Sequence, residues 1–324
     1  MGAGVALVGL GMWGPQVAAG ARRAGLELVT CFARDPDARA AFATHAGCEA
    51  AASLDEALGH PGVQGVLLVT PNSVHAEQAV AAARAGKHVF VEKPIADTVD
   101  NARVMANECR RAGVTLMVGH AFRRLGAARR VRELIDSGAL GQVVLAEATF
   151  SLPGRFPERA WRAHRQTNPG GPIMQLGIHH VDTLVSWLGP IAASSGRFAH
   201  VATAADIDDV GVLCLEFASG ALGVVTGSYV SPKTLALRLQ GTEAVVDYRT
   251  DFSVWPDTPA LDGATTLTLD GEPVWFESRD MLAEELAEFG RCVTEGASPE
   301  TAADEAIAVL GAVLDALDAN DPAA

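Results

Sequence analysis

A glycine-rich turn close to the N-terminus constrains the fold of this chain more than any other feature. Residues 9–14 read Gly-Leu-Gly-Met-Trp-Gly, directly after an apolar segment at 5–8 and before helically spaced residues from 15 onward. In such a strand–turn–helix unit the first glycine permits the tight turn, the second lets the backbone approach a pyrophosphate, and the third allows close helix packing. The helix N-terminus adds N–H donors and a positive dipole end. The segment therefore predicts a dinucleotide site that includes Gly9, Gly11, Met12, Trp13 and Gly14.

Short apolar segments alternate with amphipathic helical ones over the first 120 residues. The expected strands span 5–8, 26–32, 65–70, 88–91 and 115–118, and the expected helices span 15–24, 37–46, 53–58, 75–85 and 99–112. Strands that alternate with helices predict βαβ units. We therefore expect an α/β fold that begins with a parallel sheet covered by helices on both faces.

The pattern changes after about residue 122. A helix is expected at 127–137, followed by strands at 143–150, 210–217, 221–229, 235–240 and 244–248. The spacing of these strands and their turn residues predict a mostly antiparallel sheet. Residues 151–200 are expected to form a long irregular insertion, and such insertions are usually functional.

The net charge of −14 is unevenly distributed along the chain. Residues 277–324 hold 12 acidic and 2 basic side chains together with helically spaced apolar positions, which predicts helices with a solvated acidic face. An acidic chain disfavours a nucleic-acid partner, because phosphate binding depends on basic surface.

The cysteines and the apolar runs indicate where the protein works. Five dispersed cysteines without CxxC spacing point to reduced thiols rather than to a zinc site or a disulfide framework. The N-terminus lacks the basic and long apolar regions of a leader, and no apolar run reaches the roughly 18 residues of a spanning helix. We expect a cytoplasmic protein without a membrane partner.

The end of the second expected strand bears on the choice of nucleotide. About 20 residues after the glycine turn, NAD-binding domains carry a carboxylate that binds the ribose 2′-hydroxyl. Ala33 stands at that position here, and Arg34 follows it. A small residue beside a guanidinium suits a 2′-phosphate, because Arg forms charge-assisted bonds to phosphate oxygens. The sequence favours NADP over NAD, and the alternative is a solvated Arg34 with Asp35 at the ribose.

Three further segments follow expected strands and face the same crevice, since ligands of open parallel sheets bind beyond the carboxyl ends of the strands. Besides residues 119–120, they contribute the cofactor-binding candidates Thr70, Pro71, Asn72, His75, Glu92 and Lys93. A lysine that follows a buried strand into such a crevice is suited to proton transfer. We therefore single out Lys93, and the alternative is a lysine that extends to solvent.

The insertion contains a glycine-led segment with two histidines. Gln175, His179 and Asp182 are spaced i, i+4 and i+7, which places them on one face of a helix. His179 is a candidate proton donor or acceptor beside a nicotinamide, and the alternative is a structural histidine. His180 is expected to point elsewhere and pack. No metal is expected, because a His-His-x-Asp cluster matches the usual ligand spacings poorly.

Five segments together resemble the glucose-fructose oxidoreductase and inositol dehydrogenase family, often written Gfo/Idh/MocA. They are GLGMWG at 9–14, TPNSVH at 70–75, VEKP at 91–94, GHAFR at 119–123 and GGPIMQLGIHHVDTL at 170–184. Residues 1–122 resemble the family's Rossmann NAD(P)-binding domain, and residues 123–324 resemble its α/β substrate domain with an open sheet. The resemblance implies hydride transfer between nicotinamide C4 and a secondary alcohol or ketone of a sugar, cyclic polyol or related compound.

Position by position, the resemblance implies that Lys93 and His179 are catalytic and move the hydroxyl proton, and that the peptide before Pro94 is cis. One residue departs from the pattern, because many polyol dehydrogenases of the family carry Asp where this chain has Gln175. Glutamine binds a hydroxyl but takes up no proton, so Lys93 is expected to do more of the acid–base work. Two alternatives stay open: an NAD-dependent glycoside hydrolase of the same family, and a non-catalytic nucleotide-binding sensor.

Arginines are dense around the expected substrate site. Arg123, Trp161 and Arg162 are substrate-binding candidates beside Lys93, Gln175 and His179, through a stacked sugar face and bonds to hydroxyl or carboxylate groups. The other arginines of the region are Arg124, Arg129, Arg130, Arg132, Arg155, Arg159 and Arg165, and most of those at 129–132 are expected to be solvated. This density motivates the hypothesis of an anionic sugar. A homodimer or homotetramer is expected, because an open sheet leaves a face to cover.

Overall fold

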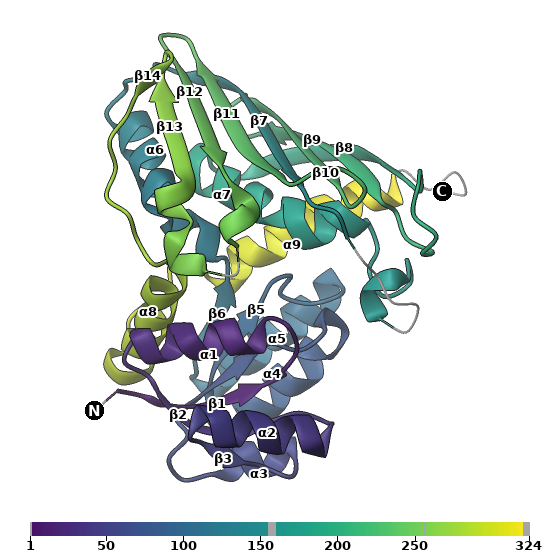
Figure 1. Cartoon of the computed structure of the whole chain (residues 1–324), viewed down its shortest axis with the longest axis vertical. Helices are drawn as coiled ribbons and strands as arrows, with labels where there is room; N and C mark the ends of the chain where they lie inside the picture. The colour runs from purple at the N-terminus through teal and green to yellow at the C-terminus, as the bar shows by residue number, and fades with distance from the viewer. Residues whose placement is uncertain (1, 155–159, 256, 320–324) are drawn as a thin grey trace. The chain divides into compact units, whose positions relative to one another are not determined.

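The computed structural model describes residues 2–154, 160–255 and 257–319, and the chain divides into two units (Figure 1). The first unit contains Met1–Ala121 and Leu282–Ile307, and the second contains Phe122–Met281 and Ala308–Ala324. The first boundary falls beside the division expected at residue 122. The second unit does not take up all the remaining chain, because a C-terminal segment returns to the first unit.

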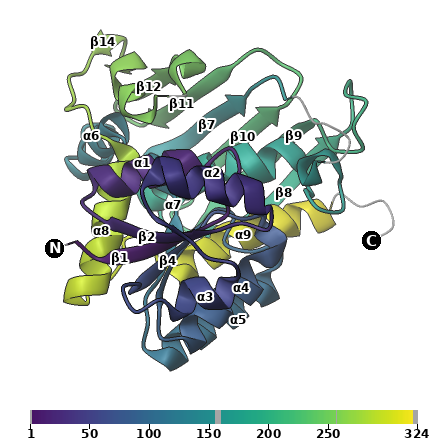
Figure 2. The same cartoon turned by 60° about the horizontal axis from the view of Figure 1, so that its bottom comes forward.

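A six-stranded parallel sheet forms the centre of the first unit, in the order β3-β2-β1-β4-β5-β6. Its strands are β1 (Gly4–Val8), β2 (Glu27–Phe32), β3 (Glu49–Ala50), β4 (Gly65–Leu68), β5 (His88–Glu92) and β6 (Leu116–Gly119). The helices between them are α1 (Gly14–Arg23), α2 (Pro36–Ala46), α3 (Leu54–Gly59), α4 (His75–Arg84) and α5 (Val99–Ala112). Figure 2 shows α1 and α2 on one face of the sheet and α3, α4 and α5 on the other. This doubly wound order confirms the predicted Rossmann-like sheet.

Side-chain caps determine where two of these helices begin. The Asp35 carboxylate accepts a hydrogen bond from the backbone N–H of Asp37 at 3.0 Å, so α2 starts directly after the turn that ends β2. The Thr98 hydroxyl accepts one from the N–H of Asn101 at 3.1 Å at the start of α5. Each such cap stabilises its helix by about 1 kcal/mol.

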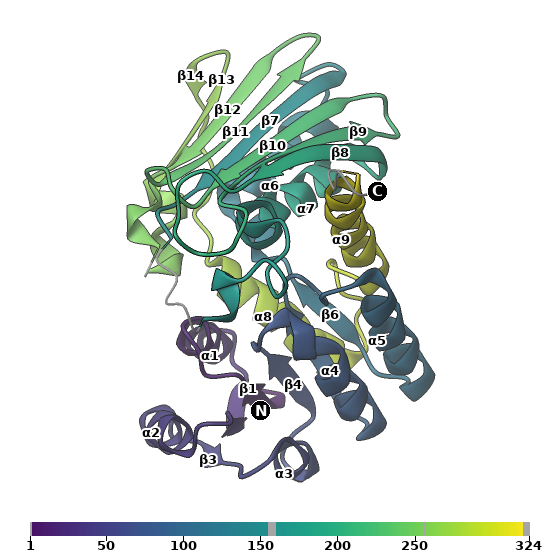
Figure 3. The ribbon, with the colours of Figure 1, turned by 90° about the vertical axis from the view of Figure 1, so that its right-hand side faces the viewer.

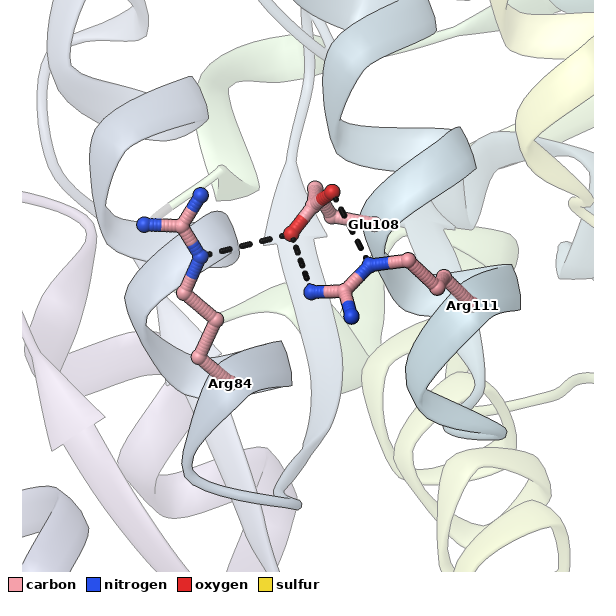
Figure 4. A network of polar contacts seen from close by, with 3 residues as sticks. All are labelled: Arg84, Glu108 and Arg111. Carbon is pink, nitrogen blue, oxygen red and sulfur yellow. Dashed lines mark hydrogen bonds and ion pairs between the residues drawn. The ribbon is translucent and has the colours of Figure 1, made fainter.

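A surface ion network joins α4 to α5 (Figure 4). The Glu108 carboxylate accepts from Arg84 Nε at 3.3 Å and from Arg111 Nη2 at 2.8 Å. Both guanidinium groups are well exposed, so each pair contributes no more than about 1 kcal/mol. The network links two neighbouring helices at the surface of the first unit.

Helix α8 (Met281–Glu295) adds its apolar side to the core of the first unit. Leu286 and Phe289 are fully buried in the cluster that contains residues of β1, α1 and β5. The ring of Phe289 lies 5.9 Å from that of Phe90 in an edge-on arrangement. This packing accounts for the place of α8 in the first unit, whereas the sequence predicted a second domain that runs from residue 123 to 324.

An eight-stranded sheet forms the second unit, in the order β14-β13-β12-β11-β7-β10-β9-β8. Its strands are β7 (Val143–Ser151), β8 (Ile191–Ala199), β9 (Val210–Phe217), β10 (Leu222–Ser228), β11 (Thr234–Gly241), β12 (Val245–Thr250), β13 (Thr265–Leu269) and β14 (Glu272–Pro273). Only the central pair of β7 and β10 is parallel. The mostly antiparallel sheet predicted from the sequence is confirmed.

The second sheet carries its helices on one face. Figure 3 shows α6 (Gly126–Asp136), α7 (Ile178–Leu188) and α9 (Ala303–Asp318) along the same side of the sheet. The expectation of an irregular insertion over 151–200 is wrong in its extent, because Ile191–Ala199 form the edge strand β8. Most side chains of β8 lie open to solvent, so its sequence lacks the apolar alternation that marks a strand.

Candidate active site

The glycine turn leaves the backbone before α1 without side chains at Gly9, Gly11 and Gly14. Gly9 has φ of 98°, and a Cβ there would lie 2.5 Å from the carbonyl oxygen of Val69. A Cβ on Gly14 would lie 2.7 Å from the Gly9 carbonyl oxygen, whereas one on Gly11 would meet no atom within 4 Å. Helix α1 begins without a side-chain cap and without an acidic residue in its first turn. The open space at Gly11 and the uncapped helix end fit a pyrophosphate.

Trp13 joins the glycine turn to the end of β5. Its indole Nε1 donates to the Glu92 carboxylate at 2.7 Å, and the second oxygen of Glu92 accepts from the backbone N–H of Lys93 at 3.2 Å. Burial raises the pKa of the Glu92 carboxyl. The peptide between Lys93 and Pro94 is cis, as the resemblance implied. The structure therefore brings together the turn and the lysine segment that the sequence singled out.

His75 lies between two loops, with a backbone carbonyl oxygen facing each of its ring nitrogens. Its ring is 1% exposed, with Nε2 at 2.9 Å from the carbonyl oxygen of Thr70 and Nδ1 at 3.1 Å from that of Pro94. Burial lowers the pKa of the imidazole. Both ring nitrogens thus face backbone carbonyls, so we replace the expected cofactor contact of His75 with a supporting role.

Asn72 presents a different kind of buried group. Its side chain is 4% exposed, and within the described part of the chain its Oδ1 has no hydrogen-bond partner. A buried amide oxygen is costly to leave unsatisfied. Asn72 lies in the turn that follows β4, so this acceptor fits a hydroxyl donor such as that of a ribose.

Two arginines lie near the end of β2, where the sequence singled out one. Arg34 is exposed beside the half-buried Ala33. Arg39, at the first turn of α2, donates from Nη1 to the Ala33 carbonyl oxygen at 2.9 Å, and its guanidinium lies 5.9 Å from the Phe32 ring. Asp35 is committed to capping α2. Sequence reasoning missed Arg39, although its place four residues after a capping Asp indicates that it shares the face of that residue.

In the second unit, His179 follows a π-helical turn. Residues Ile173–Gly177 form this turn, which continues into α7. Gly171 precedes it with φ of 44°, where a Cβ would lie 1.9 Å from the carbonyl oxygen of Asp208. A π turn changes the rotation per residue, so the i, i+4 spacing of Gln175 and His179 no longer fixes them on one face. Such turns occur frequently at functional sites.

Two phenylalanine rings lie close to the His179 imidazole. The Phe122 ring stacks on it with centroids 4.2 Å apart and an interplanar angle of 16°, and the Phe150 ring lies 6.2 Å away. Trp255 adds an edge contact to Phe122 at 6.3 Å. His179 as a whole is 9% exposed. Sequence reasoning missed Phe122, whose only local sign was its place between His120 and Arg123.

The neighbouring histidine is structural, as the sequence predicted. His180 is 1% exposed, its Nε2 lies 3.2 Å from the Thr149 carbonyl oxygen, and its ring lies 5.8 Å from that of Phe150. Burial lowers the pKa of His180 to about 4. The imidazole is therefore neutral at ordinary pH and donates to the sheet.

Arg123 does not present its guanidinium to a substrate. Its Nε and Nη2 donate to the two oxygens of Asp182 at 2.8 and 2.5 Å, and the two side chains are 4% and 2% exposed. We therefore correct the expected substrate-binding role of Arg123. A buried, bidentate pair satisfies both partners and joins the segment at 121–124 to α7.

Trp161 and Arg162, two of the substrate-binding candidates, contact each other. The Arg162 guanidinium lies 4.3 Å from the Trp161 ring centroid, and both side chains are partly exposed. Burial lowers the pKa of Arg162. Arg165 pairs with the buried Asp208 at 3.0 Å. The arginines expected at 155 and 159 lie outside the described residues.

A glycine turn at the first strand of this parallel sheet, with an uncapped helix behind it, defines a dinucleotide-binding protein. Comparison with known families agrees. Residues 3–120 match the model described as "Oxidoreductase family, NAD-binding Rossmann fold", and residues 128–247 match the "GFO/IDH/MocA C-terminal domain". The chain is 30% identical to D-xylose 1-dehydrogenase (NADP(+)) 2 of Haloferax volcanii over 88% of this chain and 86% of that protein.

The chain is also similar to a second curated relative and to a solved structure. It is 36% identical to the 1,5-anhydro-D-fructose reductase of Ensifer adhaerens, over 56% of this chain and 55% of the reductase, so the match spans little more than half of that protein. The solved structure of an oxidoreductase from Desulfitobacterium hafniense superposes with a TM-score of 0.95, at 33% identity over 98% of this chain and 96% of that one. This chain belongs to the Gfo/Idh/MocA family. It is an NAD(P)-dependent oxidoreductase. None of its described helices is long and apolar enough to cross a membrane.

Proposed function

We propose that the chain moves hydride between nicotinamide C4 and a secondary alcohol or ketone of a sugar, cyclic polyol or related compound. The observation that carries the proposal is the 2.7 Å hydrogen bond from Trp13 to Glu92, because it fastens the glycine turn to the strand end that bears Lys93. The bound nicotinamide supplies the hydride chemistry. The chain supplies binding, orientation and the movement of one proton.

Lys93 and His179 are the proposed proton carriers. In the oxidative direction the substrate hydroxyl gives its proton to the Lys93 amine or the His179 imidazole as the carbon loses hydride, and in the reductive direction the same group returns it. Gln175 holds a substrate hydroxyl by hydrogen bonding but takes up no proton. The ring of His179 is held against Phe122, which limits its orientations and favours proton transfer along one direction.

NADP is the proposed cofactor in preference to NAD. Arg34 and Arg39 flank Ala33, and the nearby Asp35 carboxylate is engaged by backbone N–H groups of α2. Removing either arginine is expected to raise the Kd for NADPH roughly 10- to 100-fold, since hydrogen bonds to charged groups contribute about 1.5–3 kcal/mol, and to leave the Kd for NADH nearly unchanged. Arg103→Ala, on the exposed side of α5, is the matched control. Tighter binding of NADH than of NADPH by the unmodified protein would contradict the proposal.

An anionic sugar is the proposed substrate class. The Arg162 guanidinium lies over one face of the Trp161 ring, so only the opposite face is offered to a sugar ring, and the guanidinium offers bidentate bonds to a carboxylate. A hexuronic acid is therefore expected to be turned over with a lower KM than the matching neutral hexose. Arg162→Met should abolish that difference, and equal turnover of the two sugars by the unmodified protein would count against an anionic substrate.

The decisive assay follows nicotinamide absorbance with a panel of sugars, sugar acids and polyols, with NAD and NADP in parallel. Lys93→Ala and His179→Ala should lose at least about 100-fold in kcat, because positioned acid–base groups contribute about 10²–10⁴-fold. The matched controls are the exposed Lys233→Ala and His200→Gln. Release of free sugar without net change of the nicotinamide would instead favour a glycoside hydrolase. Cofactor binding without turnover of any substrate would favour a sensor.

A homodimer or homotetramer is the proposed assembly, formed through the helix-free face of the second sheet. Strands β7, β10, β11 and β12 line a shallow pocket of about 350 Å³ there, with a charged row that includes Glu147, Arg238 and Asp247. Mixed charges on an open sheet face suit a self-complementary contact. A monomeric mass by light scattering would refute this assembly.

The five free thiols support the proposed cytoplasmic location.

A further inference from the structure

The buried pair of Arg123 and Asp182 has no place in the proton transfer proposed above. Its two hydrogen bonds are parallel and both partners are almost fully removed from solvent. Burying two charges is costly, and an apolar pair of similar volume is often equally or more stabilising. Stability alone therefore does not account for an ion pair at this position, whereas a fixed geometry does.

The residues beside this pair connect it to His179. Phe122 precedes Arg123 in the chain, and its ring stacks on the His179 imidazole at 4.2 Å. Asp182 lies three residues after His179 on α7, so the two occupy neighbouring positions of that helix. Two consecutive residues of the segment at 121–124 thus contact two positions one helical turn apart. The Arg123–Asp182 ion pair fixes the segment at 121–124 to α7, and Phe122 of this segment packs against the His179 ring.

The backbone of His179 is fixed independently of its ring. The Thr183 hydroxyl donates to the His179 carbonyl oxygen at 2.8 Å, within α7. The helix therefore determines where the residue lies, while the stacked Phe122 limits how the ring is turned. Only the latter depends on the segment that Arg123 anchors.

We propose that Arg123 and Asp182 form a clamp that positions the His179 ring by holding Phe122 against it. Neither residue touches substrate or cofactor in this role, so both are positioning residues. The inference rests on the proposed function, in which His179 carries the proton. A loosened clamp is expected to lower kcat while leaving KM near its normal value, because the ring leaves its productive orientation without the loss of a substrate contact.

The test compares three variants with the unmodified chain. Asp182→Asn keeps the shape and removes the charge, Arg123→Lys keeps the charge and removes the fork, and Arg123→Met with Asp182→Leu replaces the pair with apolar groups. The last variant is expected to stay folded, because it leaves neither charge buried without the other. Asp136→Asn, which alters an exposed pair with Arg132 on α6, is the matched control.

Two readouts separate positioning from mere stability. The first readout is kcat calculated per mole of titrated cofactor-binding sites, so that unfolded protein is not counted. It is expected to fall roughly 10- to 100-fold in Asp182→Asn and in the apolar double variant, and less in Arg123→Lys. The second is the NMR signal of the His179 ring protons in protein without substrate, assigned with His179→Gln. Stacking by Phe122 gives this signal a ring-current shift that each clamp variant should reduce, as should Phe122→Leu.

The outcomes are distinguishable. A normal His179 signal and normal kcat per site in the apolar double variant would overturn the clamp, whatever its stability. A lost ring-current shift with unchanged kcat would support the clamp and refute His179 as the proton carrier, so the proposed function would fail on that point alone. A lost shift together with the expected fall in kcat supports both.

Discussion

Protonation of His180 is expected to destabilise the second unit in mild acid. The imidazole is buried against Phe150, and burial lowers its pKa to about 4, against about 6.5 for an exposed histidine. Between these two values the unfolded chain binds a proton that the folded chain refuses, so stability is complete above pH 6.5 and is lost as the pH falls towards 4. From the two pKa values, His180 alone should remove about 2 kcal/mol of unfolding free energy at pH 5 relative to pH 7.5.

The assay is urea unfolding followed by tryptophan emission at pH 7.5 and pH 5. Four of the five tryptophans, Trp161, Trp187, Trp255 and Trp275, lie in the second unit, so the emission reports mainly on it. His180→Gln retains a donor for the Thr149 carbonyl but does not titrate, so its stability should fall about 2 kcal/mol less between the two pH values than that of the unmodified chain. His200→Gln, an exposed histidine of the same unit, should leave the difference unchanged. The reasoning is refuted if His180→Gln and the unmodified chain lose equal stability.

Three further results are expected. Trp13→Phe removes the indole donor from the buried Glu92 carboxylate and should raise the Kd for the nicotinamide cofactor about tenfold by fluorescence titration, and an unchanged Kd would contradict the link between turn and strand. Iodoacetamide at pH 7 should modify Cys48 before Cys31. The hydrogen bond between the two thiols lowers the pKa of Cys48, whereas the same contact and burial raise the pKa of Cys31. Peptide mass spectrometry that finds Cys31 modified first would contradict this prediction. Asp35→Ala should cost about 1 kcal/mol of stability through the lost cap and leave the Kd for NADPH unaffected, whereas a weakened Kd would place this carboxylate at the ribose.

The first unit could be predicted from the sequence because its signals are local. The strand before Gly9, the glycines themselves and the alternation that follows are all read within a few residues of one another. The same holds for Lys93, which comes directly after the buried strand β5. Features that depend on periodicity and turn chemistry can be predicted from the residues that form them, because those residues are neighbours in the sequence.

The roles of His75 and Arg123 could not be predicted in this way. His75 contacts the carbonyl of Pro94, 19 residues away, and Arg123 pairs with Asp182, 59 residues away. A polar side chain in a functional segment looks the same in sequence whether it faces a ligand or a distant partner. The strand β8 was missed for a related reason, since its Ala- and Ser-rich sequence becomes a strand only through pairing with β9.

The return of α8 to the first unit has a consequence for biosynthesis. The parallel sheet is complete at residue 119, yet Leu286 and Phe289 fill its core from a part of the chain that is made after the whole second sheet. During synthesis the first six strands therefore leave the ribosome with an open apolar side, and their core closes only after α8 has emerged. A fragment that ends at residue 121 lacks these side chains, so an autonomous nucleotide-binding fragment needs residues 282–307 joined to it.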